Sequence, residues 1–376
     1  LSAKSYELKS MSQQNIKTNS SHKTRTIILI ALAALLLVTL LVYLLWFRPM
    51  VTTPISSTLS LPTRVPTVEN AENSQSDLVE GPSNLPAVPV FVRPTKVPLA
   101  KPVCGDDLVW TVLLVGIDYR GEGYTYGLAD IIRLVQIDFV EMTVSMVPLP
   151  RDLIVEVPEG RFTVPDPFKI NQTYLFGTPG MGGFVGSGGG AGGLAEAIQY
   201  NFGVTVDHYG VINFETFINI IDAIGGVEVD LPVAISGGSL GNFPAGVQTL
   251  DGERALALAR IRYGYGDSFR ISNQTIILRA VLKKMAKPAM LIKVPDLLQE
   301  FSGGFLTDLS VDQLTSLGIC TLRHLDTQNL HAFEVPQDLL TGGSGYIPTL
   351  NNNAFVYRWD EAFVAWIHES LLAGSP

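Results

Sequence analysis

The 376-residue sequence predicts a three-layer α/β/α domain with a mixed central sheet, preceded by one transmembrane helix and a Pro-rich linker. Three observations predict this organisation: a long uncharged apolar run near the N-terminus, a proline-crowded stretch after it, and then short apolar runs mixed with longer amphipathic ones. The boundaries that we expect are a cytoplasmic tail at 1–26, a transmembrane helix at 27–47, an extracytoplasmic linker at 48–103 and a folded domain at 104–376.

The predicted membrane helix has the length needed to cross the hydrocarbon layer, about 20 residues, and it contains no charged side chain. A cleaved signal peptide is the alternative, but the apolar run is longer than a typical signal core and no small-x-small cleavage site follows it. The preceding tail carries Lys4, Lys9, Lys17, Lys23 and Arg25 against the single acid Glu7. Because positive residues stay inside, we expect a single-pass protein of the cell membrane whose N-terminus is cytoplasmic and whose domain is extracytoplasmic.

The linker is crowded with Pro, Ser, Thr and Val and shows no sustained period of 2 or 3.6 residues. Its prolines at 82, 86, 89, 94, 98 and 102 exclude a helix there. A semi-rigid extended spacer and plain disorder are both compatible with this composition.

Three apolar runs at 111–117, 131–138 and 143–149 predict buried strands. If they pair as a meander, the chain direction reverses at each step, and the end of the first strand, the start of the second and the end of the third meet at one edge. That edge would collect Asp118, Asp130 and Arg151.

The remaining sequence of the domain predicts helices and further strands. The expected helices are 193–202, 213–224, 252–259 and 268–285, and the expected strands are 208–211 and 227–231. The glycine-rich run at 177–193 lacks the GK[ST] ending of a phosphate-binding loop, so it favours a mobile loop or lid.

Arginines concentrate in one segment although the formal net charge is -9. They are Arg254, Arg260, Arg262 and Arg270. A guanidinium group binds phosphate through a planar, permanently charged fork, so the cluster predicts a local anion site. Apolar Ile261 favours an extended backbone there, which would point Arg260 and Arg262 to the same side.

Composition excludes other classes of site. The acidic balance argues against a nucleic-acid partner. The sequence has two cysteines and scattered histidines, so a zinc site is not expected. Cys104 and Cys320 can form a disulfide outside the cytoplasm, but their spacing does not show whether they are close.

Taken together, these segments resemble the catalytic domain of the LytR-CpsA-Psr family over residues 108–290. The matching pieces are Leu114-Val-Gly-Ile-Asp118, Gly127-Leu-Ala-Asp130, Leu149-Pro-Arg-Asp152, Lys169-Ile-Asn171, Asp222-Ala-Ile-Gly-Gly-Val227, Gly246, Leu250-Asp-Gly252, Ala255-Leu256, Arg260-Ile-Arg262, Asp267, Arg270 and Gln274. The stretch Leu306-Thr-Asp-Leu-Ser310 is similar to the segment that closes the family's domain.

The resemblance implies a phosphotransferase that moves a glycopolymer from undecaprenyl pyrophosphate to peptidoglycan and releases undecaprenyl phosphate. By the family pattern, Asp118 and Asp130 hold Mg²⁺, with Mn²⁺ as the alternative. The same pattern has Arg151, Arg260, Arg262 and Arg270 bind the pyrophosphate with support from Gln274. It also implies an apolar tunnel for the lipid between the sheet and the helices.

Two departures separate this chain from the pattern. Leu128-Ala129 stand where many relatives carry Arg-Ser, and Asn273 stands where they usually carry Arg. Two positive charges are therefore missing, and Arg133 would replace one only if a strand irregularity turned it toward the site. The departures leave two other functions open: a non-catalytic polyprenyl-phosphate-binding or regulatory protein on the same fold, and a polyprenyl-pyrophosphate hydrolase that uses water as the acceptor.

Overall fold

The computed structural model of the chain describes residues 32, 34–59, 101–119, 126–262, 266–285, 287–291 and 304–373. The chain divides into two compact units, Leu1–Thr53 and Pro54–Pro376. In the first unit, residues 34–42 are α-helical and are followed by the π-helical turn η1 (Tyr43–Phe47) and by α2 (Arg48–Thr52).

Among the described residues, no helix combines the length and apolarity that a membrane crossing requires. The predicted tail at 1–26, part of the predicted membrane helix and most of the predicted linker lie outside the described residues.

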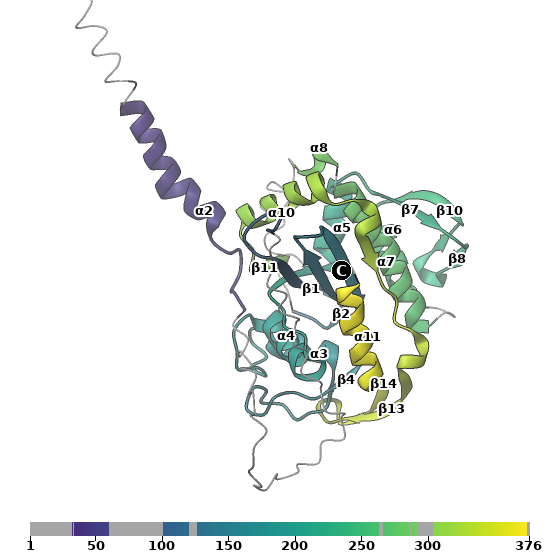
Figure 1. Cartoon of the computed structure of the whole chain (residues 1–376). Helices are drawn as coiled ribbons and strands as arrows, with labels where there is room; N and C mark the ends of the chain where they lie inside the picture. Colours follow the sequence, from purple (N-terminus) through teal and green to yellow (C-terminus); the bar gives the residue numbers. More distant parts are fainter. Residues whose placement is uncertain are drawn as a thin grey trace, which may run out of the picture. The chain divides into compact units, whose positions relative to one another are not determined.

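In the second unit, six described strands form the central sheet in the order β11-β6-β1-β2-β3-β12. Figure 1 labels β1, β2 and β11 of this sheet. They are β1 (Val109–Ile117), β2 (Ala129–Asp138), β3 (Thr143–Pro148), β6 (His208–Asn213), β11 (Phe305–Thr307) and β12 (Leu330–Ala332). Strands β1, β2 and β3 pair antiparallel in sequence order, which confirms the predicted meander. Because β6 runs parallel to β1 and β12 parallel to β3, the sheet is mixed, as predicted.

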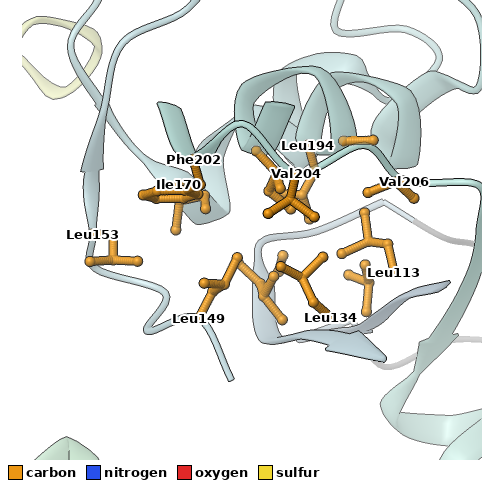
Figure 2. Packing of buried hydrophobic residues seen from close by; sticks show 14 of the residues in the cluster. Leu113, Leu134, Leu149, Leu153, Ile170, Leu194, Phe202, Val204 and Val206 are labelled. Carbon is orange, nitrogen blue, oxygen red and sulfur yellow. The ribbon is translucent and has the colours of Figure 1, made fainter. Parts of the chain in front are cut away.

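Helices cover both faces of this sheet. They are α3 (Ile170–Gly177), α4 (Gly189–Phe202), α5 (Phe214–Ala223), α6 (Gly252–Arg260), α7 (Gly266–Met285), α8 (Pro288–Leu291), α10 (Val311–His324) and α11 (Glu361–Leu372). One face packs against α3, α4 and α11; Figure 2 shows Leu113 and Leu134 of the sheet facing Leu194 of α4 in this cluster. On the other face, Val112 and Val135 pack with residues of α7 and α10. The domain therefore has the three layers expected from the sequence.

Short hairpins extend from this core. The pairs are β4 (Ile154–Val155) with β5 (Phe168–Lys169), β7 (Val227–Leu231) with β10 (Gly246–Leu250), β8 (Ile235–Ser236) with β9 (Asn242–Phe243), and β13 (Thr341–Ile347) with β14 (Asn352–Arg358). Single 3₁₀ turns lie at η2 (Gly238–Leu240), η3 (Thr327–Asn329), η4 (Gln337–Leu339) and η5 (Pro348–Leu350).

Side-chain caps fix where the helices around the candidate site begin. Asn213 accepts a hydrogen bond from the amide of Thr216 at 2.7 Å, and Asp251 accepts one from the amide of Arg254 at 2.8 Å. Such caps satisfy amide groups that have no carbonyl partner inside the helix. The sequence therefore sets the starts of α5 and α6 locally.

The glycine-rich run is not the continuous loop that the sequence predicted, because its last part forms the first turns of α4. A side chain at Gly193 would place its Cβ 2.8 Å from the Thr173 carbonyl oxygen, and one at Gly190 would lie 2.9 Å from the Tyr174 ring. These glycines allow α4 to approach α3 closely. The loop prediction was wrong for residues 189–192, which begin the helix that was predicted to start at residue 193, because these glycines allow close helix packing.

Two further contacts tie the domain together. Cys104 and Cys320 form a disulfide with a Cα–Cα distance of 6.0 Å, which resolves a pairing that the sequence left open. At the start of the predicted linker, the amide of Ser56 donates to the Thr307 carbonyl at 2.8 Å, so this short segment lies along β11.

Candidate active site

Asp118 lies directly after β1 and faces the chain that leads into β2. Its amide donates to the Leu128 carbonyl at 3.2 Å, and its Oδ1 accepts from the Leu128 amide at 2.8 Å. A Cβ added at Gly127 would lie 2.8 Å from the same oxygen, so glycine is needed beside this carboxylate. These contacts hold Oδ1 in place, while the carboxylate as a whole is exposed.

Asp130 lies at a bulge in β2. The register pairs Gly116 with Ile131 but Ile117 with Ala129, so Asp130 is the extra residue between the two pairs. In a regular strand Asp130 would share a face with buried Ile132. A bulge re-aims the side chain. Here it delivers the carboxylate to the sheet edge, where it forms an ion pair with Arg151.

Arg151 follows β3 and belongs to a small charged network. Its Nε lies 3.5 Å from Asp152 Oδ2, and Asp152 Oδ1 accepts from Lys169 Nζ at 2.8 Å. The Arg151 carbonyl accepts from the amide of Asn171 at 3.3 Å, which fixes the backbone at the start of α3. The predicted convergence of Asp130 and Arg151 at one edge is thus observed as a direct contact.

Arg260 and Arg262 differ from the expected extended pair. Helix α6 continues through Arg260, and the extended backbone begins at Ile261, which is fully buried. The prediction was wrong at Arg260 because burial of Ile261 ends the helix one residue later than the pattern suggested. Both arginines are exposed, and no shared face follows from residue spacing alone.

Arg260 is linked to Asp118 through two neighbours. Its guanidinium lies over the Phe214 ring, 5.3 Å from the ring centre. The Phe214 amide donates to the carbonyl of Tyr119 at 3.1 Å, and Tyr119 adjoins Asp118. The end of α6, the start of α5 and the end of β1 therefore meet.

Arg270 and Gln274 lie one turn apart near the start of α7, and both are buried. Gln274 Nε2 donates to the Ala259 carbonyl at 3.2 Å, next to Arg260. The contact anchors α7 to the end of α6 and places Gln274 beside the arginine that was expected to bind the same anion.

An apolar cavity of about 340 Å³ lies between the sheet and α5, α6 and α7. Its walls include Leu114, Ile131, Val211, Phe217, Ile277 and Met285. Among the described residues, the polar side chains that line it are Arg133, Asn213 and Gln274. Phe214, beneath Arg260, also lines the cavity, so the cavity reaches the arginine-bearing end of α6. The sequence predicted an apolar tunnel here but did not identify its lining.

The positions that depart from the family pattern have structural roles. Ala129 is fully buried, and Leu128 contacts Asp118 through its amide. Asn273 is buried and its Nδ2 lies 3.5 Å from the Leu258 carbonyl of α6. Arg133, the candidate substitute for a missing charge, lines the cavity together with Gln274.

Two carboxylates are available for a divalent cation, and among the described residues no cluster of three or more acidic, His or Cys ligands exists. Mg²⁺ is commonly held by one or two carboxylates, with phosphate and water completing its shell. Asp118 uses Oδ1 for the Leu128 amide, and Asp130 uses Oδ1 for Arg151. These contacts involve Oδ1 of each carboxylate, and carboxylate oxygens are the type of ligand that Mg²⁺ prefers.

Phe214 and the other cavity residues were not identified as functional from the sequence. The available signal was the apolar face of the helix that begins at Phe214, but such a face is typical of any helix packed on a core. Only the tertiary arrangement distinguishes a cavity wall from a filled core.

Comparisons with known proteins agree with this architecture. The family model described as the LytR_cpsA_psr family matches residues 96–368. A polyisoprenyl-teichoic acid–peptidoglycan teichoic acid transferase, TagU, from Oceanobacillus iheyensis is 32% identical over 208 residues, covering 55% of this chain and 61% of the relative. TagU from Bacillus subtilis is 27% identical over 207 residues, covering 54% of this chain and 61% of the relative. The chain thus matches about three fifths of the length of these relatives.

Solved structures support the same fold. B. subtilis TagV superposes with a TM-score of 0.54 at 23% identity, covering 71% of this chain and 96% of that chain. A structure of TagT bound to LIIa-WTA superposes with a TM-score of 0.52 at 19% identity, covering 71% of this chain and 90% of that chain.

Proposed function

This chain belongs to the LytR-CpsA-Psr family, and from that premise we propose that it is a membrane-anchored extracytoplasmic phosphotransferase. Its donor is a glycopolymer carried on undecaprenyl pyrophosphate, and its acceptor is peptidoglycan. The TagU relatives are named for transfer of teichoic acid to peptidoglycan, which supports a transfer of this class. The Cys104–Cys320 disulfide supports an oxidising location outside the cytoplasm.

One observation carries the proposal: the charged edge and the apolar cavity adjoin. Asp130 binds Arg151 at the sheet edge, and Arg260 lies over Phe214, which lines the cavity. A polyprenyl pyrophosphate has the same two parts, an anionic head and a long apolar tail. Burial of the tail is favoured by about 25 cal/mol for each Å² of apolar surface removed from water.

In the proposed reaction an acceptor hydroxyl oxygen attacks the phosphorus that bears the glycopolymer. The new O–P bond forms a phosphodiester, and the P–O bond to the lipid-bearing phosphate breaks with its electron pair on that phosphate. Undecaprenyl phosphate then leaves. The hydroxyl proton goes to a base, for which an Asp118 or Asp130 carboxylate oxygen not bound to metal is the candidate.

The cationic side chains act on the charge of the pyrophosphate. Arg151, Arg260, Arg262 and Arg270 bind its oxygens in this proposal, and Gln274 supports Arg260 through the end of α6. Phosphoryl transfer depends mainly on positioning and on charge stabilisation, which these donors supply. Mg²⁺ held by Asp118 and Asp130 would add a Lewis acid for the phosphate oxygens.

The full chain tests the proposal when it is incubated with Mg²⁺, a polyprenyl-pyrophosphate-linked glycan and peptidoglycan oligomers. We expect glycan attached to peptidoglycan together with free polyprenyl phosphate. Asp130→Ala is expected to abolish transfer while leaving the apolar cavity intact. Absence of any turnover in the wild type, with lipid bound normally, would overturn the proposal.

Two alternatives have distinct signatures in the same assay. The non-catalytic binding protein, favoured by Leu128 and Asn273, predicts no turnover in any assay, together with tight lipid binding that survives Asp130→Ala. The hydrolase predicts release of polyprenyl phosphate at equal rates with and without peptidoglycan.

A further inference from the structure

Arg133 is a buried cation whose side chain lines the apolar cavity, as do Asn213 and Gln274. Its side chain lies on β2 and is 2% exposed. Nη2 donates to the Ile271 carbonyl at 3.1 Å and to Thr275 Oγ1 at 2.9 Å. Nη1 is buried and makes no hydrogen bond within the described part of the chain. A buried donor without an acceptor is costly, and more so on a charged group.

Nearby charges offset this burial only in part. Desolvation, together with the charge of Arg279, lowers the pKa of Arg133 to about 10, and the charge of Glu334 opposes this shift. Since a pKa near 10 lies well above neutral pH, the guanidinium stays charged in its buried position. A buried charge of this kind favours a ligand that brings an anion.

The position of Arg133 indicates which anion. Ile271 and Thr275, to which it donates, flank Gln274 on α7, and Gln274 lines the same cavity. Along β2, Arg133 lies three residues beyond Asp130, roughly 10 Å further into the sheet. Its side chain therefore lines the cavity on the inner side of the charged edge.

We propose that Arg133 binds the lipid-bearing phosphate and stabilises polyprenyl phosphate as the leaving group. This role rests on the proposed transferase function, and Arg133 is not among the motif residues that carry the family resemblance. When the bridging P–O bond breaks, its electron pair stays on an oxygen of the lipid-bearing phosphate. Nη1–H of Arg133 donates to that phosphate, which supplies a cation on a chain that has Leu128 and Asn273 at two customary cationic positions.

A purely structural role is the competing explanation, because Nη2 also ties β2 to α7. The two roles differ in what they predict for the ligand-free protein. A structural tie predicts that Arg133→Met lowers the unfolding midpoint. A phosphate-binding role predicts little loss, since removing a buried charge offsets the lost hydrogen bonds.

The test measures binding of a polyprenyl monophosphate and of the matching polyprenol to the full chain. We expect the wild type to prefer the phosphate and Arg133→Met to lose about ten- to a hundredfold of phosphate affinity, as for a hydrogen bond to a charged group. Affinity for the polyprenol should not fall. Arg133→Lys, which keeps the charge, should restore part of the preference.

Arg279→Met is the matched control, because Arg279 is an exposed arginine of α7 that does not line the cavity. It removes the same charge and should keep the preference for phosphate. The proposal is overturned if Arg133→Met keeps that preference, or if it weakens phosphate and polyprenol equally. Both binding measurements are made without turnover, so a failure of the proposed role of Arg133 can be distinguished from a failure of the transferase proposal.

Discussion

Breaking the Cys104–Cys320 cross-link is expected to destabilise the domain by a large amount. The bond joins residues 216 positions apart. In the chain-entropy treatment, a loop of that length restricts the unfolded state by about 5 kcal/mol, and removal of native disulfides typically costs about 2–5 kcal/mol. Cys104→Ser is the cleanest perturbation, because it keeps the sulfur of Cys320, which is 4% exposed and packs 3.9 Å from Met142 Sδ.

Urea unfolding under non-reducing conditions measures the effect. With a urea slope of about 3 kcal/mol per molar, a loss of about 3 kcal/mol lowers the midpoint by about 1 M. A reductant should lower the wild-type midpoint to that of Cys104→Ser and leave the variant unchanged. Coincident midpoints for the oxidised wild type and the variant would refute the reasoning.

The same cross-link should influence the cavity. Leu278 of α7 packs in the apolar cluster around Cys320 and also lines the cavity. Loosening α10 against the sheet therefore removes support from one cavity wall. We expect Cys104→Ser to bind polyprenyl phosphate more weakly than the wild type does.

Three further predictions concern the site, the packing and the pH response. Arg151→Met removes the partner of Asp130 and should lower turnover by about 10²–10³-fold, measured as polyprenyl phosphate release, whereas exposed Arg254→Met should not. Gly193→Ala forces a Cβ against the Thr173 carbonyl and should cost about 1–3 kcal/mol in urea unfolding. Burial lowers the pKa of His368, so the unfolded chain binds a proton at this residue more readily than the folded protein does. The free energy of unfolding should therefore fall as the pH drops below about 6.5, and His368→Gln should reduce this dependence on pH.

Much of the fold could be predicted because local patterns and tertiary packing agree. The apolar runs that become β1, β2 and β3 read as strands, and the residues between them carry the acids that the meander brings together. The prediction that the whole glycine-rich run forms a loop failed for a physical reason. Glycine permits both a loose loop and a close helix contact, and only the presence of α3 opposite Gly193 decides between them.

The sequence predicted that Asp130 and Arg151 lie together at the sheet edge, but it did not predict how the side chains near this edge are directed. In a regular strand, alternate side chains point to opposite faces of the sheet. One extra residue therefore exchanges the faces of all side chains that follow it. Asp130 is that residue: with regular pairing its carboxylate would share the buried face of Ile132. A sequence pattern does not reveal a bulge, so it could not determine on which face Arg133 lies relative to Asp130. The bulge lets one short strand direct the Asp130 carboxylate to the sheet edge and the Arg133 side chain toward α7 and the cavity wall. In the proposed reaction, these two charges of opposite sign act on the two ends of one pyrophosphate.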